Sequence, residues 1–165
     1  MTETLDQPKH VGAEHLLAGD VDLHAVPSKR TRTAMVAYNF PDWMVPGILS
    51  GAKTHTVRKP KTPPYRHAAP GDRIRLYAGM RTKASRIILE PVCSTLQAAD
   101  FVFPARAGAT TFTLDGQHVD PEAFAIADGF RDLAHMRGFW FATHAPRGAE
   151  TLVFSGALIA WTSEA

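Results

Sequence analysis

The chain has 165 residues, of which 45% are hydrophobic and 21% are charged, a composition typical of one globular domain rather than a disordered chain. Its only cysteine, Cys93, excludes an intrachain disulfide and a cysteine-based zinc site. This cysteine usage, with no signal sequence and no long apolar segment, predicts a cytoplasmic protein with no membrane partner. The net charge is only +2, yet residues 53–86 hold ten of the eighteen Lys and Arg residues and one acid. Such a local excess of positive charge favours a polyanionic partner.

The chain divides into two parts at the point where apolar patterning begins. Residues 1–33 are polar, with only a short apolar patch, and are predicted to form an N-terminal arm without a core of its own. Residues 34–163 are predicted to form the domain, and its first element is a strand over residues 35–40. Asp42 is expected to cap a helix that begins near Trp43, and Gly51 to end that helix in left-handed backbone.

A segment rich in β-branched residues follows Lys53 and predicts a strand over residues 54–58. Alternation along a strand divides its side chains between two faces, with Thr54, Thr56 and Arg58 on one face and His55 and Val57 on the other. On this basis His55 is interpreted as a surface or core residue rather than as a ligand. Lys53 lies at the corner between the helix and the strand.

The next segment, residues 59–70, is basic and rich in proline, and is expected to be a contact loop. Residues 73–78 alternate, so a strand is predicted there with Ile74 and Leu76 in the core and a basic outer face. Tyr77 lies on that outer face among arginines and is the best candidate to stack on a base.

The second half of the chain predicts three further strand regions and two helices. A strand over residues 86–94 is expected at an edge or with a bulge, because it contains Pro91. The remaining expected elements are a hairpin over residues 110–119, a helix over residues 122–127 with Asp120 as its N-cap, a helix over residues 130–144, and one or two strands over residues 151–161. The fold class is therefore α+β, as a small β-barrel of about five or six strands with two or three short helices.

Several motifs, in order, carry a resemblance to a known family. They are I-L-S-G-A-K-T-H-T-V-R at residues 48–58, P-G-D-R-I at 70–74, G-M-R-T-K at 79–83, A-D-G-F at 127–130 and F-S-G-A-L-I-A-W at 154–161. With these motifs the chain resembles an ASCH domain, a member of the PUA-like β-barrel class, over roughly residues 35–161. The G-x-K-T-x-T-x-R element with the following Gly-Asp is fairly specific for the fold and much less specific for an activity.

The resemblance implies two classes of function, because the family contains proteins thought to bind RNA, an amidohydrolase that deacylates acylated cytidines, and members described as ribonucleases. In the amidohydrolase a Lys, a Thr three positions later and a Glu near the late helix act together. These fall here on Lys53, Thr56 and Asp128, where Asp is one methylene shorter than Glu. A lysine with a lowered pKa is able to take the proton of a threonine hydroxyl, which is otherwise a poor nucleophile.

The leading hypothesis is a module that binds RNA, single-stranded nucleic acid or a modified nucleoside in a basic cleft around the G-x-K-T-x-T-x-R motif. Its expected contact residues are Lys53, Thr54, Arg58, Arg75, Tyr77, Arg81 and Lys83. The alternative is a small hydrolase, an amidohydrolase on acylated cytidine or a ribonuclease, that uses Lys53, Thr56 and Asp128. No cofactor is expected, and the eight histidines lack the spacing of a metal site. The oligomeric state is left open.

Overall fold

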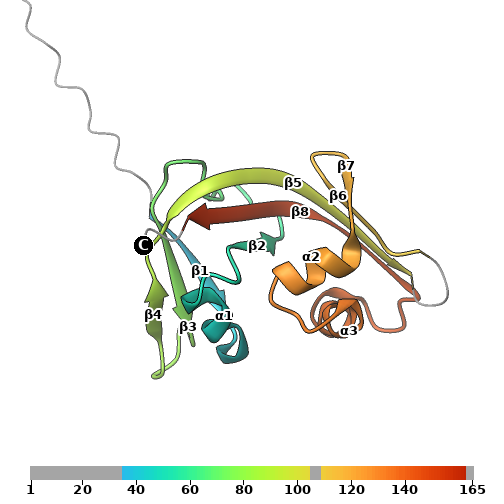
Figure 1. Cartoon of the computed structure of the whole chain (residues 1–165), viewed down its shortest axis with the longest axis horizontal. Helices are drawn as coiled ribbons and strands as arrows, with labels where there is room; N and C mark the ends of the chain where they lie inside the picture. Colours follow the sequence, from blue (N-terminus) through green and yellow to red (C-terminus); the bar gives the residue numbers. More distant parts are fainter. Residues whose placement is uncertain (1–34, 105–108, 163–165) are drawn as a thin grey trace, which may run out of the picture. The chain divides into compact units, whose positions relative to one another are not determined.

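The computed structural model describes residues 35–104 and 109–162, so the predicted arm over residues 1–33 lies outside the described residues. The α+β class is confirmed. The described part of the chain contains eight strands in two sheets and three α-helices (Figure 1). The strand number exceeds the predicted five or six, and the helix number agrees with the prediction.

A three-stranded sheet forms one part of the domain. Its strands, in spatial order, are β1 (Val36–Phe40), β3 (Ile74–Ala78) and β4 (Arg86–Leu89). β1 and β3 are parallel, and burial alternates along both strands, which the sequence predicts for β3. Ile74 and Leu76 are fully buried, which confirms the core face assigned to β3.

A five-stranded sheet forms the other part. Its strands, in spatial order, are β2 (His55–Arg58), β8 (Thr151–Thr162), β5 (Val92–Pro104), β6 (Thr111–Leu114) and β7 (Gln117–Val119). β5 and β8 pair over almost their whole length and form a long curved band (Figure 1). The predicted strand over residues 86–94 is two strands, because the chain leaves the first sheet at Glu90-Pro91 and pairs with β8 from Val92 onward.

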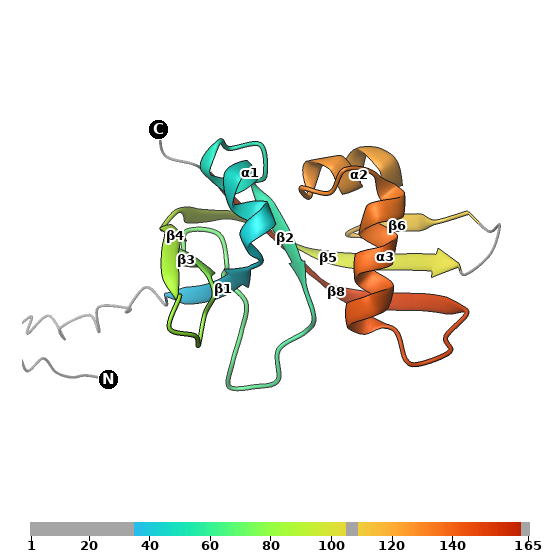
Figure 2. The ribbon, with the colours of Figure 1, turned by 90° about the horizontal axis from the view of Figure 1, so that it is seen from below.

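Two of the three helices, both from the second half of the chain, cover the inner side of this band. A 3-10 turn (Asp42–Met44) runs into α1 (Val45–Leu49), and α2 (Pro121–Ala127) and α3 (Leu133–His144) follow later in the chain. Figures 1 and 2 show α2 and α3 lying under the curve of β5 and β8. Asp120 caps α2 as predicted, and α3 begins later than expected because Asp132 caps it.

The predicted cap at Asp42 is wrong, because no side chain caps the 3-10 turn or α1. The Asp42 carboxylate instead accepts a hydrogen bond from Arg86 at 2.7 Å. The prediction for Gly51 is confirmed by its φ of 76°.

An aromatic core joins α2 and α3 to the five-stranded sheet. Its rings lie edge-to-face or tilted against one another, and it comprises Phe101, Phe103, Phe112, Phe124, Trp140 and Phe154. This packing fixes the position of α3 relative to β8. Within residues 35–104 and 109–162 no helix is long and apolar enough to cross a membrane.

The two sheets meet at one side and stay open at the other. A single backbone bridge between Arg73 and Val92 connects the start of β3 with the start of β5. Among the described strands no ladder joins β1 to β2, so the sheets form no closed barrel. One contact across this open seam is a side-chain hydrogen bond, from Arg58 Nη2 to the main-chain oxygen of Asn39 at 2.7 Å.

Candidate functional site

A pocket of about 620 Å³ lies at the open seam between β1 and β2 and extends to α3. Its volume falls within the range of roughly 300–1,000 Å³ that is usual for small-molecule sites. Its walls are largely aromatic and include Tyr38, Phe40, Phe130, Phe139, Trp140 and Phe154. Lys53, Thr56 and Asp128 all line this pocket, so the fold brings the three predicted catalytic residues to one place.

Lys53 reaches the pocket floor because the turn after α1 directs it inward. Its N–H donates to the main-chain oxygen of Gly47 at 2.9 Å, and its side chain is 1% exposed. The Lys53 ammonium donates to the carboxylate of Asp128 and, at 2.6 Å, to the main-chain oxygen of the same residue. The shorter side chain of Asp128 therefore reaches the lysine across a sequence separation of 75 residues.

Asp128 and Gly129 form the turn that ends α2, and this turn presses against the lysine. Gly129 has a φ of 92°, and a Cβ at this position would lie 3.1 Å from Lys53 Cδ. Glycine is therefore required here both by the left-handed backbone and by the close approach of the lysine side chain.

Burial dominates the electrostatics of the pocket floor. It lowers the pKa of Lys53, and nearby Arg58 lowers it further, while Asp128 opposes both effects. Lys53 and Asp128 are only 1% and 4% exposed, and a buried ion pair of this kind is poor evidence of stability because desolvation offsets the attraction. A perturbed lysine in a pocket is instead typical of a functional site.

Thr56 lies beside Arg58 on one face of β2, as the alternation predicts. Arg58 Nε donates to Thr56 Oγ1 at 3.2 Å, and Thr56 is 5% exposed. A guanidinium bonded to a hydroxyl oxygen stabilises the alkoxide that forms when the proton leaves. The arrangement therefore places an activating cation on the hydroxyl and a lysine–carboxylate pair in the same pocket.

His55 belongs to the immediate surroundings of the site, which its position on the opposite face of β2 did not indicate. Its Nε2 lies 3.6 Å from Asp128 Oδ1, and its ring packs 5.1 Å from that of Phe124. Burial lowers the pKa of His55, which favours the neutral imidazole. The sequence contains no signal for this contact, because it depends on where α2 ends relative to β2.

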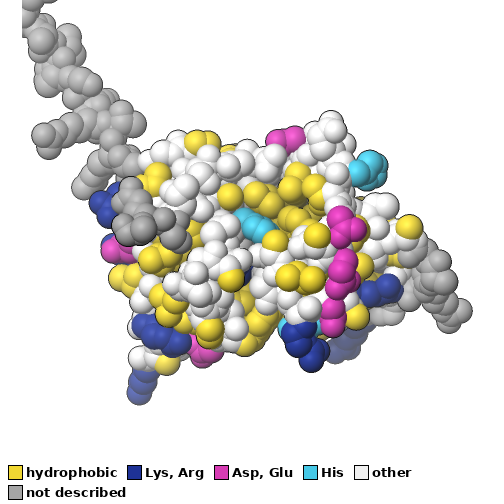
Figure 3. Space-filling view, viewed as in Figure 1, with side chains coloured by type: hydrophobic (Ala, Val, Ile, Leu, Met, Phe, Trp, Pro, Cys, Tyr) yellow, Lys and Arg dark blue, Asp and Glu magenta, His cyan; other side chains and the backbone are white. Residues whose placement is uncertain are grey.

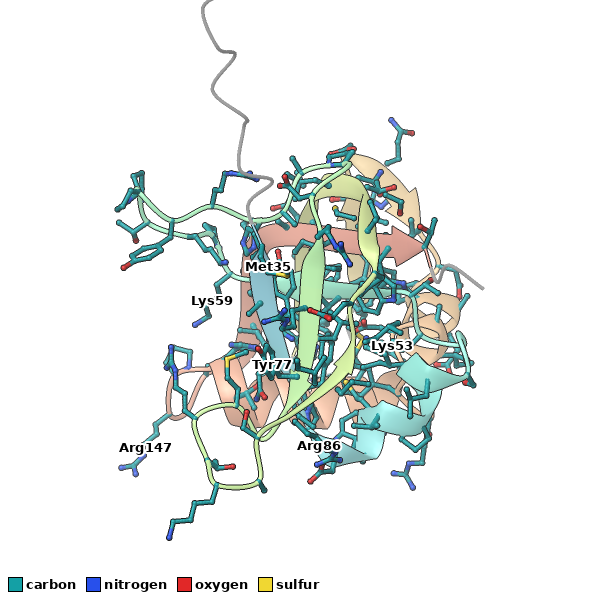
Figure 4. The ribbon with its side chains drawn as sticks, turned by 90° about the vertical axis from the view of Figure 1, so that its left-hand side faces the viewer. Met35, Lys53, Lys59, Tyr77, Arg86 and Arg147 are labelled. Atoms are coloured by element: carbon teal, nitrogen blue, oxygen red, sulfur yellow. The ribbon has the colours of Figure 1, made fainter. Side chains whose placement is uncertain are left out.

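Most of the residues expected to contact a nucleic acid lie elsewhere. Arg75 is paired with Glu90 and also donates to Tyr77 Oη at 3.4 Å, on the outer face of the three-stranded sheet that Figure 4 shows. Arg81 and Lys83 lie in the turn between β3 and β4, outside the pocket. The main-chain oxygen of Thr54 accepts from the Trp161 N–H, and its side chain does not line the pocket.

Further residues line the mouth of the pocket. Lys59, Lys61 and His67 come from the proline-rich basic loop, which the sequence indicated as a contact loop without indicating what it contacts. Tyr38 and His144 also line the pocket, although alternation and helical spacing marked them only as parts of a strand and a helix. Lys and Arg side chains lie mainly at the margins of the face in Figure 3, and hydrophobic side chains occupy its middle.

Within the part of the chain that the structure describes, no group of three or more His, Cys, Asp or Glu residues is placed to hold a metal ion. Comparison of the chain with protein-family models, with curated proteins and with solved structures found no match in any of the three.

Proposed function

We propose that this chain is a small hydrolase that removes an acyl group from the exocyclic amine of a cytosine nucleoside. The observation that carries the proposal is the convergence of Lys53, Thr56 and Asp128 on one aromatic-walled pocket, with Lys53 bonded to Asp128. The same three positions are those that the resemblance to the ASCH amidohydrolase implies. A nucleobase stacks favourably on aromatic walls, which fits a nucleoside substrate.

The residues divide the reaction among them. Lys53 passes its proton to Asp128 and then, as a neutral amine, takes the proton of Thr56 as its oxygen attacks the acyl carbonyl. Arg58 stabilises the charge on the attacking oxygen. Lys53 returns the proton to the departing amine, and water then hydrolyses the threonine ester to a carboxylic acid and free Thr56.

The pocket supports a ligand of nucleoside size better than a bound polymer. Of the predicted contact residues, Arg75, Tyr77, Arg81 and Lys83 lie away from the pocket. The charge of Arg75 is already paired with Glu90. Binding without turnover, the leading hypothesis from the sequence, therefore becomes the alternative outcome of the test.

The fold proposal is that the two sheets together correspond to a PUA-like barrel opened along one seam. The bridge between Arg73 and Val92 supports this, because it connects the sheets on one side. The bond from Arg58 to Asn39 supports it on the other side, where the pocket replaces a backbone ladder.

The test is the hydrolysis of 4-acetylcytidine to acetate and cytidine, and chromatography measures the cytidine that is formed. Thr56→Val removes the hydroxyl and keeps the side-chain shape, so we expect a loss of roughly 100- to 10,000-fold in rate, as for removal of a group that acts in the transition state. Thr56→Ser keeps the hydroxyl and is the matched control, with activity retained. If the wild-type protein binds cytidine but does not deacylate 4-acetylcytidine, the hydrolase proposal is wrong and the binding module is supported. Full activity of Thr56→Val would show that Thr56 is not the nucleophile.

A further inference from the structure

Cations gather around the ring of Tyr38, a buried side chain that lines the pocket. The guanidinium carbon of Arg58 lies 5.7 Å from the ring centroid, and Lys61 Nζ lies 5.4 Å from the same centroid. His67 stacks on the ring at 6.2 Å, and its Nδ1 lies 3.4 Å from Tyr38 Oη. Two cations and an imidazole from β2 and the basic loop therefore share one aromatic side chain.

Positive charge exceeds negative charge in the pocket. Its lining contains four cations, Lys53, Arg58, Lys59 and Lys61, and one carboxylate, that of Asp128. Asp128 is bonded to Lys53, and among residues 35–104 and 109–162 no carboxylate forms an ion pair with the other three cations. Arg58 uses Nε for Thr56 and Nη2 for Asn39, so part of its set of five N–H donors stays open to a ligand.

Neighbouring groups respond to this excess of charge. Burial lowers the pKa of Lys61, and Arg58 lowers it further. Burial also lowers the pKa of His144, and the charges of Lys59 and Arg58 add to the effect. Burial lowers the pKa of His67 as well, with a contribution from Lys61 and Arg58, while a hydrogen bond to the main-chain oxygen of Lys59 opposes it. The charge of Arg58 therefore acts on side chains of the loop and on His144 at the end of α3.

We propose that the ligand of this pocket is a phosphorylated nucleoside, with a phosphate monoester held by Arg58, Lys59 and Lys61. Such a phosphate carries roughly two negative charges and three acceptor oxygens, which matches three cations that form no ion pair with a carboxylate of the described residues. The placement of the acyl amide of this ligand beside the catalytic residues depends on the proposed hydrolase function. The phosphate site itself rests only on the charges and the geometry of the mouth.

Burial sets the orientation of the ligand. Lys59 and Lys61 are exposed, whereas Lys53, Thr56 and Asp128 are almost fully buried. Figure 4 shows Lys59 at the outer margin beside β1 and well apart from Lys53. The phosphate therefore stays at the entrance, the base lies between the aromatic walls, and the acyl amide reaches the floor.

Calorimetric titration of the Thr56→Val protein tests the phosphate site without turnover. The probes are cytidine, cytidine 5′-monophosphate and inorganic phosphate, each at low and at physiological salt. We expect the monophosphate to bind at least about tenfold more tightly than cytidine and to lose affinity as salt rises. Lys61→Gln should remove most of this preference. Arg73→Gln, which removes an exposed charge of the same basic segment outside the pocket, should leave it unchanged.

A second readout follows the imidazole of His67 by NMR. Binding of the monophosphate should raise the pKa of His67, because an anion opposes the charges of Arg58 and Lys61. Equal affinity for cytidine and its monophosphate, or equal losses in Lys61→Gln and Arg73→Gln, would overturn the proposal. Equal affinity for inorganic phosphate and the monophosphate would also overturn it, because the nucleoside would then add nothing.

These outcomes are separate from the fate of the hydrolase proposal. Phosphate-dependent binding with no deacylation of 4-acetylcytidine 5′-monophosphate by the wild-type protein would support the phosphate site and contradict the hydrolase. Deacylation of 4-acetylcytidine and of its monophosphate with equal kcat/KM would support the hydrolase and contradict the phosphate site.

Discussion

Loss of one partner of the buried pair of Lys53 and Asp128 should lower the free energy of unfolding by a measurable amount. Lys53→Met leaves the Asp128 carboxylate 4% exposed, with the His55 imidazole at 3.6 Å and no ammonium to neutralise it. Loss of one partner of a buried ion pair costs about 3–5 kcal/mol, and we expect this decrease in the free energy of unfolding. For a domain of this size the melting temperature should fall by about 6–20 °C.

The double variant Lys53→Met/Asp128→Asn shows whether the unpaired charge is the cause. Removal of both charges leaves no buried ion, so its cost should be smaller than the sum of the two single costs by about 1–3 kcal/mol. The half-exposed pair of Arg75 and Glu90 supplies a matched control. Arg75→Met with Glu90→Gln should cost much less than Lys53→Met, because solvent screens this pair.

Urea unfolding measures these quantities, with circular dichroism and the fluorescence of the three tryptophans as independent probes. The reasoning fails if Lys53→Met costs no more than the loss of the Arg75–Glu90 pair. It also fails if the single costs of Lys53→Met and Asp128→Asn add to within about 0.5 kcal/mol, because residues that form one buried pair should not act independently.

Further predictions concern pH, a glycine and the core. Burial lowers the pKa of three imidazoles, those of His55, His67 and His144. As pH falls below about 6.5, these groups therefore bind protons in the unfolded chain before they do so in the folded one. The free energy of unfolding should decrease there, by up to about 1.4 kcal/mol per pH unit for each imidazole. His55→Gln should flatten the profile between pH 7 and 5, and an unchanged profile would contradict its lowered pKa. Gly156→Ala should cost about 1–3 kcal/mol, because its Cβ would overlap the Arg58 carbonyl oxygen and the Phe154 ring, whereas Gly138→Ala in the open side of α3 should stabilise by about 0.5–1 kcal/mol; similar effects from both would contradict this. Leu76→Ala, at a fully buried position, should cost about 2–5 kcal/mol in urea unfolding, and a cost under 1 would place Leu76 outside the core.

Local features of the fold were predictable because their causes are local. The φ of 76° at Gly51, the cap of α2 by Asp120 and the hairpin of β6 and β7 each depend on a few adjacent residues. Alternation along β3 likewise identified Ile74 and Leu76 as core residues. Where a distant partner intervened, the predictions failed: Asp42 bonds to Arg86 instead of capping a helix.

The features of the site likewise fall into those visible in the sequence and those that depend on tertiary contacts. The residue types at Lys53, Thr56 and Asp128 were readable from the sequence, as was the shared face of Thr56 and Arg58. Only the tertiary structure decided that Asp128 meets Lys53 and that His55 lies beside their contact, because both depend on where the end of α2 rests against β2.

The same holds for the distribution of charge. The sequence shows how many cations lie between residues 53 and 86, but whether a carboxylate neutralises each of them depends on their neighbours in space. Arg75 is neutralised by Glu90 on the outer face of a sheet, whereas Arg58 and Lys61 meet over Tyr38 without a carboxylate partner among the described residues. The order of the residues determines how many charges lie close together along the chain. The electrostatic potential depends on the fold, because Coulomb interactions depend on distance and burial rather than on sequence separation.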